Sequence, residues 1–244
     1  MEIASSNSPI KSIGINGHPL MWEGDLKRLE DSLTYFESIG FNHVEIPPHG
    51  LDVIIGGSIN KKRLERIKSI LQKFTLNYTV HAPDPLNLMD IKNTNLHRSV
   101  FRASLEFTYE IGGRLLVYHA GRVPVDCAKD EARLEDLKAM ERELLREFSD
   151  LASRANILIG VENADIDSNI AFGKTYAYSA FIDKLVDQVI KIAGPNVGIT
   201  FDFGHAKVAS TYFGFDYFSS IKLASPYINS LHIYDSFGIP NDVE

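Results

Sequence analysis

The sequence contains a single cysteine, no long apolar run and no excess of basic residues. One cysteine, Cys127, cannot form an internal disulfide, which excludes a disulfide-rich secreted scaffold and makes a reducing compartment, the cytoplasm, the expected location. No apolar stretch approaches the ~20 residues that span a bilayer, so we expect no membrane partner. The polar N-terminus, residues 1–9, lacks the apolar core of a signal peptide.

The charge balance is acidic, with 32 aspartates and glutamates against 25 lysines and arginines and a formal net charge of −7. This balance argues against a general surface for polyanions, although a local basic groove stays open. Signature motifs are also missing. The pairs Gly56-Gly57 and Gly112-Gly113 form neither a phosphate-binding nor a dinucleotide-binding pattern, and the chain has no Gly-x-Ser-x-Gly nucleophile elbow.

No stretch rich in proline, serine or glycine divides the chain, so we predict a single domain over residues 1–244. Strand and helix signals alternate along it. Apolar residues at helical spacing predict helices over residues 25–39, 61–74, 95–111, 129–155, 181–193 and 217–224. Short apolar runs predict seven strands, which end near Ile15, Ile46, His81, His119, Glu162, Phe201 and His232.

Alternating strands and helices indicate an α/β fold of parallel strands joined by crossover helices. Two architectures fit, an open doubly wound sheet and a TIM (β/α)8-type barrel. Ligand-type side chains at the ends of five successive strands favour the barrel, because every strand of a barrel ends at one central site. The eighth βα unit is not found before the sequence stops at Glu244. We therefore expect a shortened barrel, a fragment, or a barrel whose gap another chain fills.

The residues that could take part in metal binding or catalysis lie at the ends of the predicted strands. Histidine, aspartate and glutamate bind divalent metals, and these types recur as His81, His119, Glu162, Asp202, His205 and His232. Each has an ordinary structural explanation when taken singly: a buried ion pair for the glutamate, a helix cap for the aspartate and core packing for the histidines. Such coincidences at the ends of five strands are less probable than one shared site.

We therefore predict a metal site whose ligands are Glu162, Asp202, His232, His119 and His81. Imidazole and carboxylate donors suit Zn²⁺, Mn²⁺, Fe²⁺ or Co²⁺, whereas Mg²⁺ prefers a shell of oxygen atoms. The neighbouring Asn163 is expected to orient these ligands. Glu45, at the end of the second strand, is predicted to face the same cavity, and a structural ion pair is an equally good explanation of it.

The same residues lie in short segments with a characteristic order. These segments are His81-Ala82-Pro83 followed by Asn87-Leu88, His119-Ala120-Gly121, Val161-Glu162-Asn163, Asp202-Phe203-Gly204-His205 and His232-Ile233-Tyr234-Asp235. With them the chain resembles the xylose isomerase-like TIM barrel superfamily from about Ser12 to Asp235. That superfamily includes sugar and sugar-phosphate isomerases and epimerases, and also endonuclease IV-like apurinic endonucleases. The segments indicate the superfamily without choosing among its members.

Resemblance to the sugar-acting branch implies that Glu162, Asp202 and His232 hold a divalent metal and that Glu162 is also the catalytic proton shuttle. It implies that His205 contacts the substrate, and we group Asn163 and Glu45 with it as substrate-binding residues. The expected function is a divalent-metal-dependent isomerase or epimerase acting on a small sugar or sugar phosphate. The fourth ligand of this branch, a glutamate on the eighth strand, has no counterpart in the sequence.

Two alternatives stay open. In the endonuclease branch, His81, His119, Glu162, Asp202, His205 and His232 would ligate a metal cluster that cleaves abasic DNA. The acidic balance counts against that reading, because DNA-binding proteins usually present a basic face. The other alternative is a non-catalytic barrel that acts as a binding or partner subunit. A missing strand would expose sheet edges, so we also expect homodimerisation over that edge.

Overall fold

The computed structural model describes residues 12–240, and the chain folds into two compact units. Among the described residues, the first unit comprises 12–83 and 99–116, and the second comprises 84–98 and 117–240. The single domain predicted from the sequence stays a prediction. Each unit is described by itself below.

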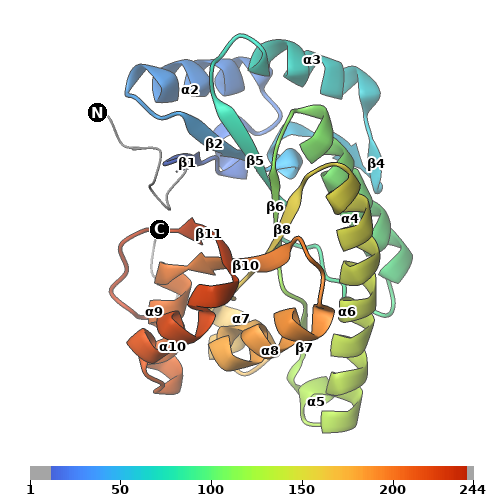
Figure 1. Cartoon of the computed structure of the whole chain (residues 1–244), viewed down its shortest axis with the longest axis vertical. Helices are drawn as coiled ribbons and strands as arrows, with labels where there is room; N and C mark the ends of the chain where they lie inside the picture. The colour runs from blue at the N-terminus through green and yellow to red at the C-terminus, as the bar shows by residue number, and fades with distance from the viewer. Residues whose placement is uncertain (1–11, 241–244) are drawn as a thin grey trace. The chain divides into compact units, whose positions relative to one another are not determined.

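The first unit contains the parallel strands β1 (Ile15–Asn16), β2 (His43–Ile46) and β5 (Asn77–His81), in that order. Helices α2 (Leu26–Ser38) and α3 (Lys61–Leu71) lie side by side over these strands, as Figure 1 shows in blue and teal. The remaining elements are short: α1 (Pro19–Trp22), the 3-10 helix η1 (Pro48–Leu51) and the antiparallel pair β3 (Ile54–Ile55) and β4 (Ser58–Ile59).

Helix α2 illustrates how the sequence forms these elements. Asp25 caps its first turn by accepting hydrogen bonds from the backbone N–H groups of Lys27 and Arg28. Its buried side chains recur every three or four residues, so they form one stripe that packs against the unit's core. The helix ends just before Gly40, whose φ of 96° lies in the left-handed region that glycine adopts without strain.

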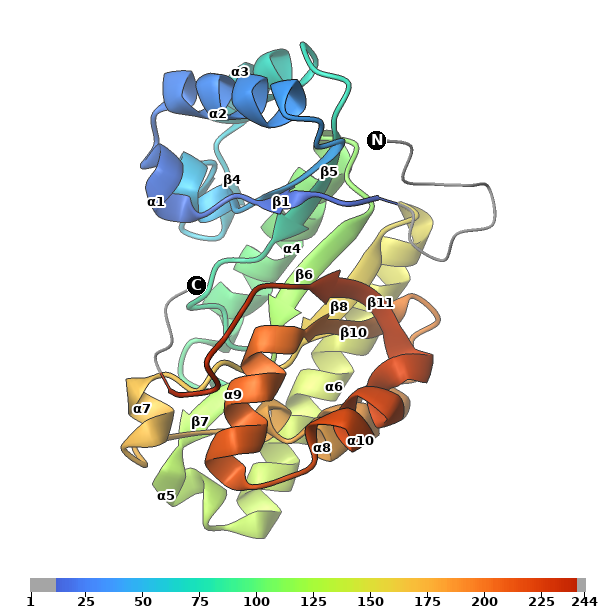
Figure 2. The same cartoon turned by 90° about the vertical axis from the view of Figure 1, so that its left-hand side faces the viewer.

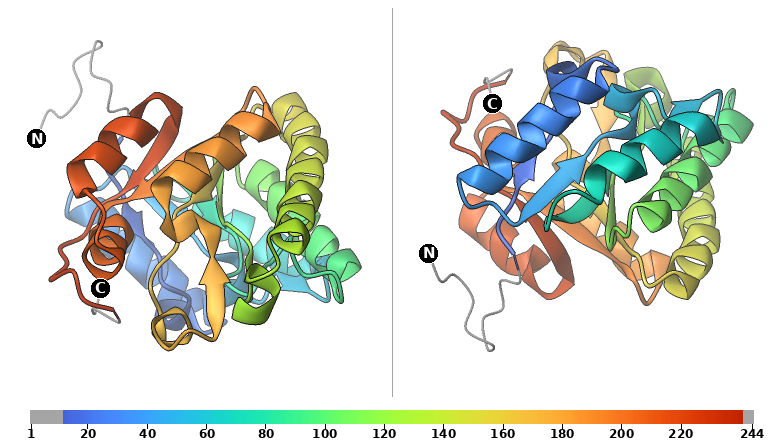
Figure 3. Two further views of the ribbon diagram at one scale, coloured as in Figure 1. Left: turned by 90° about the horizontal axis from the view of Figure 1, so that it is seen from below. Right: turned by 90° about the horizontal axis from the view of Figure 1, so that it is seen from above.

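The second unit contains the parallel strands β8 (Leu158–Glu162), β10 (Val197–Asp202) and β11 (Ile228–His232). The last three residues of β6 (Leu115–His119) also belong to it, next to β8. Helices α6 (Glu131–Arg154), α8 (Ile182–Ile192) and α10 (Tyr217–Ala224) form a continuous layer, seen from two further sides in Figure 2 and Figure 3. Helix α9 (Phe203–Phe213) follows β10 directly.

Shorter elements complete the second unit. They are β7 (Arg122–Pro124), α5 (Val125–Ala128), α7 (Ser168–Ala171), β9 (Thr175–Ala177) and the 3-10 helices η2 (Tyr178–Ala180) and η3 (Ser225–Tyr227). Strands β7 and β9 pair antiparallel. Helix α4 (Thr94–Glu110) begins in the second unit and continues in the first.

The structure confirms the α/β fold class. The seven predicted strands are β1, β2, β5, β6, β8, β10 and β11, and residues 12–240 contain no eighth βα unit. The predicted strand ends at His81, His119, Glu162 and His232 coincide with the observed ones. Within the same residues, no helix is both long enough and apolar enough to cross a membrane.

One helix was not predicted from the sequence. The sequence suggested no helix between Asp202 and Tyr217, yet α9 fills most of that interval. Its buried residues include small and polar side chains, such as Gly204 and Ser210, rather than one stripe of large apolar residues. The usual apolar periodicity is therefore absent, and the chief sequence signal is the cap at Asp202.

Candidate metal centre

The predicted ligands of the second unit come together because parallel strands end at the same edge of a sheet. In the register of the strands, Asp202 on β10 lies opposite His232 on β11. Glu162 closes β8, and its neighbour in register on β10 is Thr200. Three different strands therefore bring two carboxylates and an imidazole to one place.

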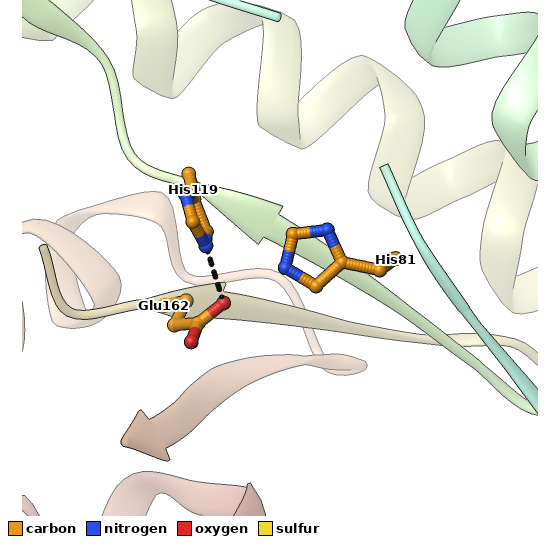
Figure 4. A group of neighbouring side chains, drawn as sticks. All are labelled: His81, His119 and Glu162. Atoms are coloured by element: carbon orange, nitrogen blue, oxygen red, sulfur yellow. Dashed lines mark ion pairs between the residues drawn. The ribbon is translucent and has the colours of Figure 1, made fainter. Parts of the chain in front are cut away.

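Glu162 lies at the centre of this group and its side chain is fully buried. Its Oε2 atom is 2.8 Å from Nε2 of His119, the ion pair drawn as a dashed line in Figure 4. Its Oε1 atom accepts a hydrogen bond from Nδ1 of His232 at 2.9 Å. The two oxygens of one carboxylate thus face two histidines from different strands.

The electrostatic surroundings keep Glu162 ionised. Burial alone would raise the pKa of its carboxyl, because the charged form loses hydration. The charges of His119 and His232, and the hydrogen bonds that they donate, outweigh burial and hold the pKa of Glu162 well below its usual range. A carboxylate that stays ionised in a buried position is suited to bind a cation.

Asp202 has two different neighbours. Its Oδ1 atom accepts a hydrogen bond from the backbone N–H of His205 at 2.6 Å, which caps the start of α9. Its Oδ2 atom faces Nδ1 of His232 at 3.8 Å. The pKa of Asp202 is raised to about 6, chiefly by burial; the charge of His205 opposes this rise and the charge of Glu162 adds to it. Asp202 therefore does cap a helix, as its ordinary structural explanation requires. The cap uses Oδ1 and leaves Oδ2 directed at His232.

His205 is held by its Nδ1 atom, which lies 3.0 Å from the backbone carbonyl oxygen of Asn163. Because a carbonyl oxygen can only accept, Nδ1 carries the proton and donates it in this hydrogen bond. The same Nδ1 atom lies 3.6 Å from Oε1 of Glu162 and 3.7 Å from Oδ1 of Asp202. This hydrogen bond engages Nδ1 of His205, so a neutral ring carries its lone pair on Nε2.

Asn163 links the ends of two strands. Its side-chain nitrogen donates a hydrogen bond to the carbonyl oxygen of Asp202 at 2.9 Å, and its Oδ1 accepts one from the Asp202 N–H at 2.7 Å. Asn163 and Asp202 are both buried. The amide of Asn163 therefore fixes the backbone that carries Asp202 relative to the backbone that carries Glu162.

The donor set fits a divalent transition metal. Two carboxylates and one imidazole are the donors that Mn²⁺, Fe²⁺, Co²⁺ and Zn²⁺ accept together. With bonds of about 2.1 Å, two ligand atoms at right angles around such an ion lie about 3.0 Å apart. Nδ1 of His232 lies 2.9 Å from Oε1 of Glu162, close to this spacing, and 3.8 Å from Oδ2 of Asp202, which is wider. An ion held by this nitrogen would replace the proton that it donates to Glu162. Glu162, Asp202 and His205 each offer a donor atom, and the three atoms lie within 4.8 Å of one another, close enough to surround one ion.

Two predicted site residues belong to the first unit. His81 ends β5, and its Nδ1 donates a hydrogen bond to the carbonyl oxygen of Ala82 at 2.8 Å, so a neutral ring carries its lone pair on Nε2. Glu45 lies near the end of β2, where its Oε2 accepts a hydrogen bond from Thr79 at 3.3 Å. The roles of His81 as a metal ligand and of Glu45 as a substrate contact stay predictions.

Sequence reasoning missed Tyr234 as part of this centre. Its ring lies edge-on to that of His205, with the ring centroids 6.0 Å apart. A Cβ atom at Gly204 would lie only 2.0 Å from the Tyr234 ring, so glycine is needed for this close approach. The glycine between Phe203 and His205 was the available signal.

A family model described as xylose isomerase-like TIM barrel matches residues 33–243. Among curated proteins, an uncharacterized protein of Methanocaldococcus jannaschii is 26% identical over 197 residues, which cover 77% of this chain. The match spans 64% of that relative's length. The segment that the family model matches contains every site residue predicted in the second unit.

Solved structures share the fold at low identity. A D-tagatose 3-epimerase-like protein superposes with a TM-score of 0.71 at 20% identity, over 93% of this chain and 78% of its own. D-allulose 3-epimerase from Methylomonas sp., solved with D-allulose, superposes with a TM-score of 0.67 at 15% identity. The match covers 93% of this chain and 73% of the epimerase. A 3-keto-D-glucoside 4-epimerase from E. coli superposes with a TM-score of 0.66 at 15% identity. The match covers 92% of this chain and 79% of that enzyme. At these identities the likeness establishes the fold, and with the family match it shows that the chain belongs to the xylose isomerase-like TIM barrel family.

Proposed function

We propose that the chain is a divalent-metal-dependent isomerase or epimerase acting on a small sugar or sugar phosphate. The observation that carries this proposal is the buried Glu162 carboxylate, placed between His119 and His232 with Asp202 beside it. The solved relatives named above include enzymes described as sugar epimerases, which supports the choice of substrate class. The proposal goes beyond the fold, because related folds host many chemistries.

Glu162, Asp202 and His232 would hold the metal, with His119 and His81 as the further ligands predicted from the sequence. The donor chemistry suits Zn²⁺, Mn²⁺, Co²⁺ or Fe²⁺. When bound, such an ion supplies Lewis acidity, which polarises the carbonyl and the adjacent hydroxyl of a sugar. Asn163 supports the ion's site by fixing the backbone of Asp202.

The chain's own residues would move the proton. Epimerisation next to a carbonyl, and isomerisation through an enediol, both begin with the removal of a proton from carbon, which needs a base. Glu162 is ionised, because its two histidine partners lower its pKa, and we assign it as the base that accepts that proton and returns it. His205 would hold a substrate hydroxyl through its ring, and we group Asn163 and Glu45 with it as substrate-binding residues.

Exchange of substrate hydrogen with solvent tests this function. The purified protein, loaded with Mn²⁺ or Co²⁺, is incubated in D2O with a panel of ketoses, aldoses and their phosphates, and deuterium on carbon is measured by NMR. We expect incorporation next to the carbonyl of at least one sugar. We also expect Glu162→Gln to lower the rate by about 10²–10⁴-fold.

Glu143→Gln is the matched control, because Glu143 is an exposed glutamate of α6 with a side chain 72% accessible. It should exchange deuterium at the wild-type rate. Absence of deuterium from every sugar of the panel, with metal bound, would contradict the proposal.

A further inference from the structure

Glu141, on α6, is a fully buried carboxylate outside the metal centre. Its Oε1 atom accepts hydrogen bonds from the Tyr118 hydroxyl at 2.9 Å and from the Gly121 N–H at 2.7 Å. Its Oε2 atom accepts from the Tyr178 hydroxyl at 2.6 Å and from the Gln188 side chain at 3.1 Å. A buried carboxylate that accepts four hydrogen bonds is a specific polar site, and packing alone does not explain it.

The directions of these hydrogen bonds are fixed by their partners. The Tyr118 oxygen accepts a hydrogen bond from the Leu88 N–H at 3.0 Å, so its own proton points to Glu141. The Gln188 amide is oriented by Arg142, which donates to its oxygen at 2.8 Å, so its nitrogen faces the carboxylate. Burial raises the pKa of Glu141 above its usual value, and the four donors offset this rise only in part. Glu141 is therefore an acceptor on both oxygens.

The Oε1 partners of Glu141 bracket a predicted metal ligand. Tyr118 and Gly121 lie on either side of His119-Ala120, at the point where β6 ends and the chain turns. Neighbouring residues of a strand point to opposite faces, so Tyr118 reaches α6 while His119 reaches Glu162. Glu141 thus holds both ends of the turn that presents His119.

We propose that Glu141 is a positioning residue for the metal centre, which acts by holding the turn from Tyr118 to Gly121 and thereby the ring of His119. This inference rests on the proposed function, because it assigns the metal as the group that His119 serves. The two oxygens have separate tasks: Oε1 holds the His119 turn, and Oε2 holds η2 and α8 through Tyr178 and Gln188.

This division of tasks provides a matched pair of variants. Tyr118→Phe and Tyr178→Phe each remove one buried hydroxyl from Glu141, on Oε1 and on Oε2 respectively. Mn²⁺ affinity of the folded protein is measured by titration calorimetry, and thermal stability is measured in EDTA. We expect Tyr118→Phe to weaken Mn²⁺ binding at least threefold and Tyr178→Phe to leave it within twofold of wild type, while both lower the melting temperature.

Glu141→Met removes the acceptor while keeping a similar volume. We expect it to weaken Mn²⁺ binding about 10–100-fold, the range found when a partner that orients a ligand is lost. Glu143→Met, at an exposed position two residues along the same helix, should bind Mn²⁺ as wild type does. If Glu141→Met does not fold, the two tyrosine variants still decide the matter.

Equal Mn²⁺ affinity in wild type and Tyr118→Phe, or equal weakening by the two tyrosine variants, would overturn the positioning role, since a merely structural carboxylate predicts no difference between its two oxygens. A wild-type protein that binds no Mn²⁺ would instead overturn the proposed function, and this inference with it. The two failures are distinguishable because only the second is seen in the wild type.

Discussion

Nδ1 of His232 lies 2.9 Å from Oε1 of Glu162, although 70 residues separate them in the sequence. The contact exists because β8, β10 and β11 are parallel and end at one edge, with β10 between the two residues. On its other oxygen, Glu162 meets His119 from β6. One ionised carboxylate thereby joins the ends of three strands. Substitutions that move any of these ends should therefore change metal affinity.

Gly204→Ala should destabilise the protein. The added Cβ would lie 2.0 Å from the Tyr234 ring, which is closer than real Cβ contacts, and the start of α9 offers no room to move because Asp202 caps it. Overpacking of this kind costs about 1–3 kcal/mol of unfolding free energy. Denaturant unfolding of the metal-free protein measures it.

A second substitution shows whether the Tyr234 ring is the cause. Tyr234→Ala removes the clash, so the double variant Gly204→Ala/Tyr234→Ala should lose less stability than the sum of the two single variants. Strict additivity of the two losses would contradict the packing that we describe.

Asn163→Ala should weaken metal binding and stability together. The variant removes both hydrogen bonds between the Asn163 side chain and the backbone of Asp202, and it leaves a buried N–H without its acceptor. We expect a loss of about 1–3 kcal/mol in unfolding free energy, measured with denaturant, and a tenfold or greater rise in the Mn²⁺ dissociation constant. A normal Mn²⁺ affinity in the folded variant would show that this amide does not support the ligands.

Asp202→Asn should change how stability depends on pH when metal is removed with EDTA. Burial raises the pKa of Asp202 to about 6 in the folded state, above its ordinary value of 3.8. A group with a raised folded pKa contributes stability that is fully present below the unfolded pKa and is lost as pH rises through the folded value. The wild type should therefore match the asparagine variant near pH 4 and fall below it by on the order of 2–3 kcal/mol above pH 6.

Asp216→Asn is the matched control for that pH series. Asp216 also caps a helix, accepting from the Ser219 N–H at 2.7 Å, but it is exposed and its hydrogen bonds with Ser219 lower its pKa. The asparagine variant at this position should show no gain over wild type above pH 6. A gain at Asp216 equal to that at Asp202 would mean that burial of Asp202 is not the cause.

Homodimerisation stays a prediction, and the structure suggests where to test it. Within the second unit β11 is the last strand of the order and pairs with β10, and apolar side chains on and after it are exposed: Leu231, Ile233, Phe237 and Ile239. We expect Ile233→Asp/Phe237→Asp to dissociate a dimer seen by light scattering. Ile190→Asp, at an exposed position on α8, should leave the dimer intact. A wild-type protein that stays monomeric at high concentration would contradict homodimerisation.

Much of the fold could be predicted from the sequence because most of its strands are buried. Apolar runs such as the one before Glu162 stand out from their surroundings, and each ends where a polar residue must reach the edge of the sheet. The ligand-type residues could be predicted for the same reason. What could not be predicted was their pairing, such as which oxygen of Glu162 faces which histidine, because it depends on rotamers and register.

The missed features had weaker local signals. Helix α9 buries small and polar residues, so its sequence has no apolar stripe. Strands β7 and β9 have three residues each, too few to show a period. Glu141 was overlooked as one more charge on a long helix, yet it lies on the stripe of Leu137, Leu145 and Phe148. A charged residue on an apolar stripe is a signal that sequence reasoning could have used.

The number of metal ions bound per chain tests the central claim most directly, and elemental analysis of the purified protein measures it. A single site at Glu162, Asp202 and His232 predicts about one divalent transition-metal ion per chain in the wild type. The same account predicts that Glu162→Gln loses this ion while the Glu143→Gln control keeps it. Two or three ions per chain would point to the metal cluster of a DNA-cleaving enzyme, and none would point to a non-catalytic barrel. Either result would contradict the account.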